Sequence, residues 1–174
     1  MKPEEAKVLL ESEFQEVVKQ DTNYYIVNKK DVVCVLPYTL DDGGLLNTIG
    51  VLEIWNEEER KSGFTLLKGF LSEDDGTNLV GANRIFYDVT GVNLTDAAQW
   101  MYLGSLFISL YCDSPLKVYA IDMTGAEIEE QVMDEKTKQI FKMVESSTVA
   151  QSDDMLFLGA FARLFNFFYA KSLK

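Results

Sequence analysis

Apolar residues follow two different periods along this chain, and each period predicts a kind of element. Short runs rich in β-branched and aromatic residues predict strands. The expected strands cover residues 24–27, 32–36, 49–55, 64–67, 100–110 and 116–123. The first two are separated by Asn28-Lys29-Lys30-Asp31, which predicts a hairpin turn between them.

Other segments carry apolar residues at helical spacing. Within residues 4–20, six apolar side chains recur at intervals of three or four with acids between them, which predicts an N-terminal helix. Further helices are expected over 79–89 and 134–144, and Asp153 is expected to cap a last helix that runs to about residue 171. Strands mixed with helices predict an α+β or α/β domain.

Length and composition fit one soluble globular domain over residues 1–174, with the N-terminal helix within 1–20 and the core over 22–170. A formal net charge of −12 disfavours binding to nucleic acid or to an anionic membrane surface. It favours protein partners, basic surfaces, or small ligands bound in a locally basic pocket. The first residues contain no signal-peptide core, so a cytoplasmic location is expected.

The residue inventory also limits the chemistry. The chain has no histidine, which excludes histidine-based catalysis and the commonest zinc sites. Cys34 and Cys112 lie far apart in apolar runs and are expected to be buried free thiols.

The segment from Leu67 to Val92 carries the most informative pattern. Gly69 follows an apolar strand, an acidic turn comes next, and a predicted helix holds Arg84 and Asp88 before Gly91. This order resembles the Nudix box, which runs Gly, five residues, Glu, seven residues, then Arg-Glu-apolar-x-Glu-Glu-x-Gly-apolar. Residues 117–125 also resemble the late strand of the ADP-ribose pyrophosphatase branch of that family.

The resemblance implies an α/β/α sandwich with a mixed sheet, and a helix whose glutamates hold Mg²⁺ for hydrolysis of nucleoside diphosphate-linked substrates. Counted back from Gly91, the three helix carboxylate positions hold Ile85, Asp88 and Val89. Mg²⁺ prefers several oxygen ligands, and a single aspartate between two apolar side chains offers too few. The sequence therefore predicts a degenerate Nudix box without a metal cofactor, in which Asp88 is only a weak candidate ligand.

The upstream part of the motif is also shifted. The position of the upstream Glu falls on Asp75 counted from Gly69, and on Gly76 counted from Gly91, so the loop holds one extra residue. Glu73, Asp74 and Asp75 are interpreted as a solvated turn. Arg84 is expected to pair with Asp88, four residues on.

Two further features have possible functional roles: a second group of acids and the apolar last helix. Glu127, Glu129 and Glu130 follow a strand where relatives often place a further ligand or base, and a solvated acidic loop is the favoured interpretation. The last helix is apolar over more than one face, so it is either buried or covered by another chain. The interface candidates on it are Phe157, Phe161, Phe165 and Phe168.

Three hypotheses follow. The leading one is a catalytically inactive Nudix-like domain that serves as a binding or structural module, with a protein partner, a homo-oligomer or a nucleotide ligand. A virus or phage origin, with a place in the virion or host cytoplasm, is an added guess that no residue carries. The second is a divergent Mg²⁺-dependent Nudix hydrolase that recruits other acids to Asp88. The third is a coincidental motif in an unrelated α+β domain.

Overall fold

The computed structural model describes residues 7–20, 22–56, 61–107, 115–127 and 138–172. The strands are β1 (Lys7–Glu11), β2 (Gln15–Gln20), β3 (Asn23–Asn28), β4 (Val32–Leu40), β5 (Leu46–Asn56), β6 (Lys61–Thr65), β7 (Leu67–Phe70), β8 (Trp100–Leu106), β9 (Leu116–Asp122) and β10 (Gln139–Glu145). The α-helices are α1 (Asn78–Thr90) and α2 (Met155–Ser172), and short 3₁₀ turns cover Glu73–Asp75, Ala97–Gln99 and Ser146–Gln151.

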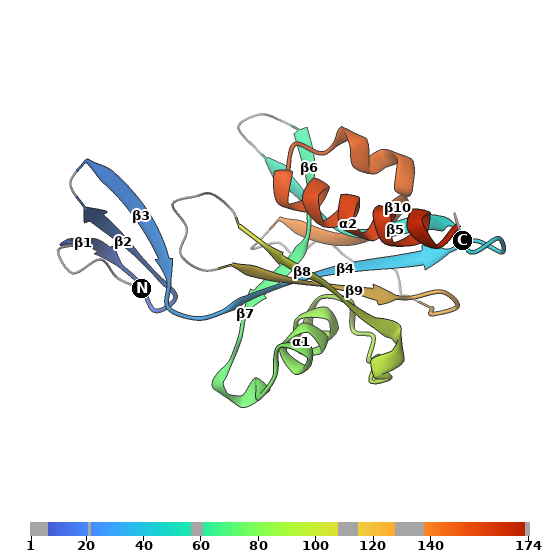
Figure 1. Ribbon diagram of the computed structural model, residues 1–174, viewed down its shortest axis with the longest axis horizontal. Coiled ribbons are helices and arrows are strands. Elements are labelled where there is room, and N and C mark those ends of the chain that lie inside the picture. The colour runs from blue at the N-terminus through green and yellow to red at the C-terminus, as the bar shows by residue number, and fades with distance from the viewer. Residues whose placement is uncertain (1–6, 21, 57–60, 108–114, 128–137, 173–174) are drawn as a thin grey trace.

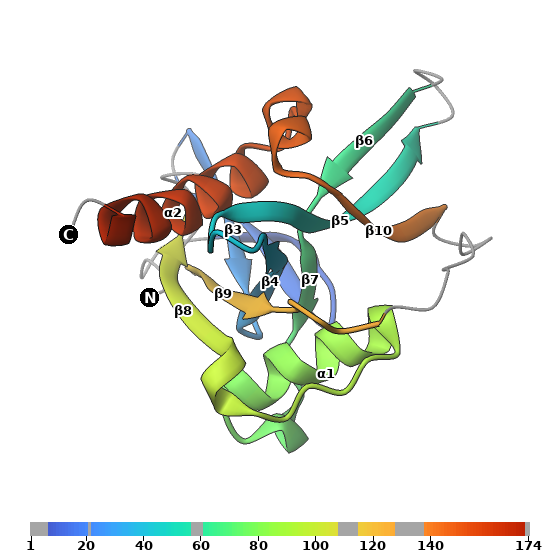
Figure 2. The same ribbon diagram turned by 90° about the vertical axis from the view of Figure 1, so that its right-hand side faces the viewer.

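The main sheet is mixed, and a helix covers each of its faces (Figures 1 and 2). Its central path is β10-β5-β4-β9-β8, with β6 paired to β5 and β7 paired to β4. β4 and β9 run parallel, whereas the other pairs in the sheet are antiparallel. The predicted α/β/α sandwich with a mixed sheet is confirmed.

The central strand β4 is apolar on both sides because it serves two cores. Val33 and Val35 face α1, in a cluster that includes Ile85 and Phe86. Cys34 and its alternate neighbours face α2, in a cluster that contains Phe157, Ala160 and Leu164. Burial raises the pKa of the Cys34 thiol to about 12, so this cysteine is an inert core residue, as predicted. Cys112 lies outside the described residues.

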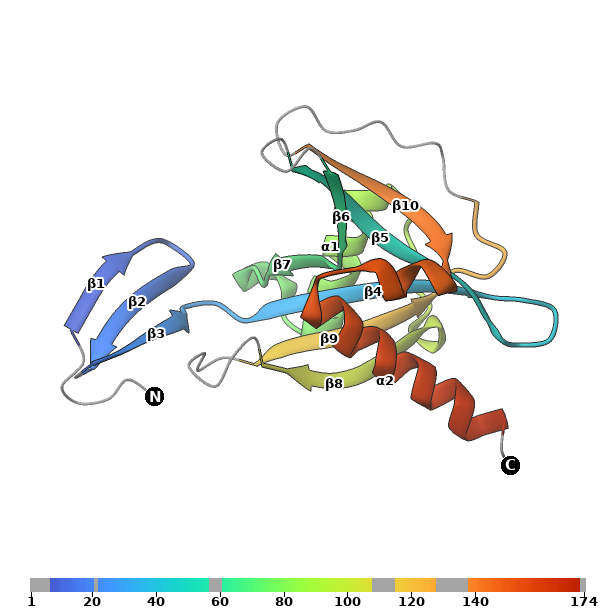
Figure 3. The same cartoon turned by 90° about the horizontal axis from the view of Figure 1, so that it is seen from above.

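The predicted N-terminal helix is wrong. Residues 7–20 form β1 and β2, which join β3 in a separate three-stranded antiparallel sheet beside the main body (Figure 3). Ser12 ends the first strand with a tight turn, since its hydroxyl accepts from the N–H groups of Phe14 and Gln15 at 3.3 and 2.9 Å. β2 then finds a full-length partner in β3. Pairing with a neighbouring strand outweighs a helical period that is weak by itself.

Two further predictions need correction. The expected hairpin over residues 24–36 does not form, because β3 pairs with β2 in the small sheet while β4 enters the main sheet. The part of the predicted helix 134–144 that the structure describes is strand β10, paired with β5 from Gln139↔Ile54 to Glu145↔Thr48. A long partner strand supplies backbone hydrogen bonds that local propensity does not anticipate.

The last helix begins one residue later than predicted. Asp154, not Asp153, caps it, since its Oδ1 accepts from the N–H groups of Leu156 and Phe157 at 2.8 and 3.1 Å. Its other carboxylate oxygen accepts a hydrogen bond from the Thr65 hydroxyl and so ties α2 to β6. Within the described part of the chain, no helix has the length and apolar character needed to cross a membrane.

Candidate functional site

The segment that carries the motif is built from a strand, a capped turn and a capped helix. β7 leads into the turn Glu73–Asp75, which Ser72 caps while the Asp75 carboxylate accepts from the Ser72 N–H at 2.7 Å. Thr77 caps α1, with its hydroxyl accepting from the Val80 N–H at 3.2 Å. Gly91 ends α1 at φ 72°, a left-handed conformation that glycine adopts at little cost.

Asp75 and Arg84 form the central polar contact of this segment. The Arg84 Nε lies 2.8 Å from Asp75 Oδ1 and a terminal nitrogen lies 2.9 Å from Oδ2, a two-point ion pair. The same Arg84 nitrogen donates to the Phe70 carbonyl at 2.9 Å and so joins α1 to β7. The prediction of a solvated turn is therefore wrong for Asp75, which is only 6% exposed, while Glu73 and Asp74 are exposed as predicted.

The charges of this pair stabilise one another. Hydrogen bonding from the Arg84 side chain holds the pKa of the Asp75 carboxyl below its ordinary value, although burial opposes the shift. The same contact raises the pKa of Arg84. Asp88 lies farther from the guanidinium, at 3.4 Å, and its side chain is 58% exposed. The predicted Arg84–Asp88 contact exists, but it is secondary to the contact with Asp75.

Ile85 and Val89 face the core rather than a ligand cleft. Ile85 is 5% exposed and lies in the cluster between α1 and the sheet, and Val89 packs at the edge of that cluster. Gly69 approaches Ile85 so closely that a Cβ atom there would lie 2.9 Å from Ile85 Cγ1. The glycine thus makes room for the isoleucine.

The fold of this chain is similar to the folds of several solved hydrolase structures. An ADP compounds hydrolase aligns over 97% of this chain and 94% of its own, with a TM-score of 0.61 and 10% identity. A NUDIX hydrolase of Listeria monocytogenes aligns over 79% and 93%, with a TM-score of 0.56 and 15% identity. A structure from a study of MutT from Aliivibrio salmonicida and Vibrio cholerae aligns over 77% and 98%, with a TM-score of 0.51 and 10% identity. The chain has the Nudix fold.

These likenesses lie in the fold, not in the sequence. No protein-family model matches the chain, and no curated protein matches it significantly. The hypothesis of an unrelated α+β domain is wrong, because the domain shares its fold with solved Nudix hydrolases. The correspondence of α1 to the helix of the Nudix box stays a prediction.

Among the described residues, the side chains around α1 offer few oxygen ligands for Mg²⁺. Of Ile85, Asp88 and Val89, only Asp88 has a side-chain oxygen that could bind a metal ion. The described part of the chain places no group of three acidic or cysteine side chains together. Glu127 is exposed in the turn after β9, and Glu129 and Glu130 lie outside the described residues. A Mg²⁺ site on α1 would therefore need oxygen ligands in addition to Asp88.

The four predicted interface residues of α2 differ in their exposure to solvent. Phe157 is fully buried, so its assignment as an interface residue is wrong. Phe161 and Phe168 are partly buried against the core, and Phe165 is 50% exposed. α2 thus docks along one face and leaves a second apolar face uncovered.

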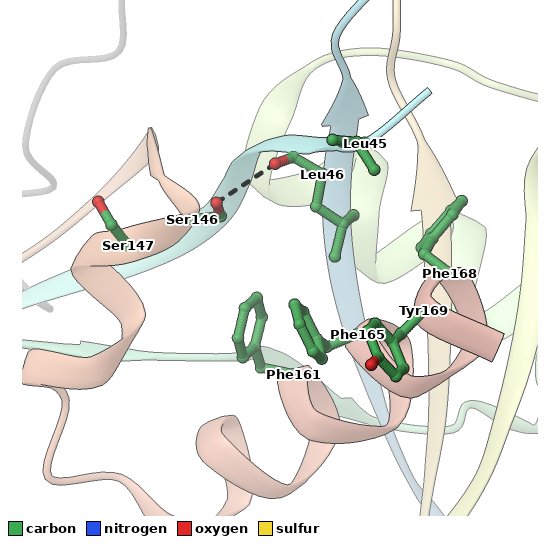
Figure 4. A pocket seen from close by; sticks show the side chains of 8 residues that line it. All are labelled: Leu45, Leu46, Ser146, Ser147, Phe161, Phe165, Phe168 and Tyr169. Atoms are coloured by element: carbon green, nitrogen blue, oxygen red, sulfur yellow. Dashed lines mark hydrogen bonds between the residues drawn. The ribbon is translucent and has the colours of Figure 1, made fainter. Parts of the chain in front are cut away.

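The uncovered face borders a groove of about 480 Å³ (Figure 4). We call it the α2 groove; its lining residues are Leu45, Leu46, Ser146, Ser147, Phe161, Phe165, Phe168 and Tyr169. Sequence reasoning did not find the lining residues outside α2, because they come from segments about a hundred residues apart. The one local signal was Leu45, an apolar residue directly after the loop Asp41–Gly44.

Proposed function

We propose that this chain is a Nudix-fold domain without metal-dependent hydrolysis that serves as a binding module for another protein. The observation that carries the proposal is the burial of Ile85 against Gly69, where the Nudix pattern has a carboxylate. A glutamate in that position would place a charge in an apolar core, which is costly without a partner. Isoleucine at this position is therefore part of the core packing, and restoring the carboxylate would also require changes in the residues around it.

The binding role is supported by the second helix. Phe165, Tyr169 and Leu45 are 50%, 55% and 58% exposed around the α2 groove. Apolar surfaces of this kind on a soluble domain are typical of interaction sites, and aromatic side chains often contribute most of the binding energy there.

The test is hydrolysis of a nucleotide panel with Mg²⁺ and with Mn²⁺, covering ADP-ribose, dinucleotides and nucleoside triphosphates. We expect no turnover at high protein concentration. Asp88→Ala is the control, because Asp88 is the carboxylate that remains on the helix. Turnover that disappears in Asp88→Ala would overturn the proposal and reveal a metal site rebuilt from other acids.

One observation favours the second hypothesis, a divergent Nudix hydrolase of nucleoside diphosphate-linked substrates. The Asp88 side chain is 58% exposed and lies at a carboxylate position of the motif, beside Arg84. If this hypothesis holds, the enzyme would need Mg²⁺ and further acids, for which Glu129 and Glu130 are candidates. Single Glu129→Gln and Glu130→Gln variants would then lose turnover as Asp88→Ala does.

A further inference from the structure

We infer that the α2 groove takes the apolar face of a basic amphipathic helix from another protein. The inference rests on the proposed binding function and names the chemistry of the partner. Four features carry it: an aromatic ridge, walls that are already packed, a neighbouring strand that is paired on both sides, and acidic residues at the border of the groove.

The ridge consists of Phe161, Phe165 and Tyr169, which follow one another at intervals of four on α2. The ring centroids of Phe161 and Phe165 are 6.2 Å apart, and those of Phe165 and Tyr169 are 6.0 Å apart. Figure 4 shows these rings along the helix, with Leu45 and Leu46 on the opposite side. A ridge with this spacing beside a groove is the surface into which a second helix packs.

The walls of the groove are held by the core. The Phe168 ring contacts the buried Tyr38 ring edge-on at 5.4 Å, and the Ser146 hydroxyl donates to the Leu46 carbonyl at 3.3 Å. A surface that is ordered before binding loses less conformational entropy when a partner arrives.

Strand pairing argues for a helix rather than an extended segment. Next to the groove, Thr48 of β5 pairs with Thr39 of β4 on one side and with Glu145 of β10 on the other. At Thr48, β5 therefore has no free edge to which an extended peptide could add, and at Leu46 the carbonyl already accepts from the Ser146 hydroxyl.

Charge argues for a basic partner. Asp41 and Asp42 lie in the turn before Leu45, and Glu145 directly precedes Ser146; all three are exposed. The described basic side chains of β10 and α2 have acidic or carbonyl partners, since Lys142 pairs with Glu53 and Arg163 donates to the Leu103 carbonyl. A second copy would bring another net charge of −12, whereas a lysine-rich helix would be attracted.

The test uses the full chain and two labelled synthetic helices. Both carry leucine and phenylalanine at positions i, i+3, i+4 and i+7, and the remaining positions hold lysine in one and glutamate in the other. Fluorescence anisotropy is measured at low and high salt. We expect the lysine peptide to bind at least about 10-fold more tightly than the glutamate peptide, with a difference that salt reduces.

Variants locate the site. Phe165→Ser and Tyr169→Ser should each weaken binding of the lysine peptide by about 10-fold or more, as at interface hot spots. Asp42→Asn combined with Glu145→Gln should weaken it at low salt and not at high salt. Tyr102→Ser is the matched control, because Tyr102 is an aromatic residue of β8 that is 54% exposed and does not line the groove.

Three outcomes would overturn the inference: no binding of the lysine peptide, equal binding of both peptides, or unchanged binding by Phe165→Ser and Tyr169→Ser. A dimer of the free chain that Phe165→Ser dissociates would assign the groove to a second copy instead. Nucleotide turnover is measured on the same samples. If the chain hydrolyses a nucleotide and also binds the lysine peptide, only the proposed loss of hydrolysis is rejected. If it neither hydrolyses a nucleotide nor binds the peptide, only the partner assigned to the groove is rejected.

Discussion

At the scale of single residues, the segment from β7 to the end of α1 contains a two-point ion pair and, next to it, an apolar core contact. Arg84 contacts both oxygens of the buried Asp75, and Ile85 beside it enters the core. The two neighbours on α1 therefore have opposite surroundings, one polar and one apolar. Arg84 is a positioning residue for the loop between β7 and α1.

The first prediction concerns the stability that this ion pair contributes. Asp75→Asn keeps the shape of the side chain but removes its charge, so it should lower the free energy of unfolding by about 2 kcal/mol at pH 7. The Arg84 side chain is 38% exposed, and its partial hydration keeps the loss moderate. Urea denaturation measures the change. Asp88→Asn, the exposed control, should cost less than about 0.5 kcal/mol.

Comparison with Asp75→Asn also isolates the part of the pH-dependent stability that comes from Asp75. Because the pKa of Asp75 is lowered in the folded state, its stabilisation is present above the unfolded value of about 3.9 and is lost as the pH falls through the folded value. The stability gap between the wild type and Asp75→Asn should therefore begin to shrink as the pH falls below about 3.9, and it should keep shrinking until the pH has passed the lowered folded value. The pKa of Glu53 is also lowered, mainly by its hydrogen bond with Lys142, but that contribution is common to both proteins. A gap that stays constant from pH 7 to pH 3 would contradict this assignment.

The second prediction concerns the contact between Gly69 and Ile85. A Cβ atom in Gly69→Ala would lie 2.9 and 3.0 Å from two Ile85 side-chain atoms, so we expect a loss of about 1–3 kcal/mol by overpacking. In an Ile85→Ala background, which lacks those atoms, the same glycine change should cost much less. Gly63→Ala, where a Cβ meets nothing within 4 Å, is the control in thermal or urea denaturation. Equal costs in both backgrounds would show that the contact does not limit this position.

At the scale of elements, local sequence signals decide where α1 begins and ends. Thr77 accepts from the Val80 N–H at the first turn, and the Gly91 N–H donates to the Tyr87 carbonyl at 2.8 Å at the last. The observed helix Asn78–Thr90 matches the predicted 79–89 closely for this reason. The caps lie within the element itself, so distant residues are not needed to place them.

The third prediction concerns the C-terminal end of α1. Gly91 has φ 72° with open space around it, so Gly91→Ala should lower stability by about 1–2 kcal/mol through backbone strain alone. Gly91→Asn should cost less, because asparagine tolerates the left-handed region better than alanine. Thermal unfolding of the two variants gives the comparison, and equal losses would argue against a backbone origin.

At the scale of the whole molecule, a small sheet is joined to a larger α/β/α body (Figure 3). The Phe14 ring, in the turn between β1 and β2, stacks on the Phe70 ring of β7 at 4.6 Å and 16°. The Leu71 N–H also donates to the Asp31 carbonyl at 2.9 Å. That residues 1–174 act as one domain stays a prediction, and this junction is where it can be tested.

The fourth prediction addresses the junction by hydrogen exchange. Phe14→Ala removes the stacked ring, so amides of β1–β3 should exchange about 10-fold faster while those of β4 and β9 keep their rates. Tyr24→Ala is the control, because Tyr24 lies on the same sheet, is 58% exposed and contacts Lys19 rather than the body. Faster exchange throughout the molecule would instead indicate that the small sheet and the body unfold together.

The sequence by itself determined the elements whose signals are local. Strands β4 and β9 are dense in apolar residues on both faces, and α1 carries its own caps, so their places follow from short segments. That Ile85 and Val89 stand where the Nudix pattern has glutamates could also be read directly, although the burial of Ile85 could not.

The tertiary structure alone decided the elements and surfaces that depend on distant partners. Residues 7–20 and 139–145 have patterns compatible with a helix, but pairing with β3 and β5 makes them strands. The Asp75–Arg84 contact could not be predicted from the spacing of the motif, because the loop holds one residue more than the Nudix pattern. Only the geometry of the turn brings these two side chains together. The α2 groove joins segments from both halves of the chain. In each case the deciding free energy comes from contacts between residues far apart in sequence, which no local propensity contains.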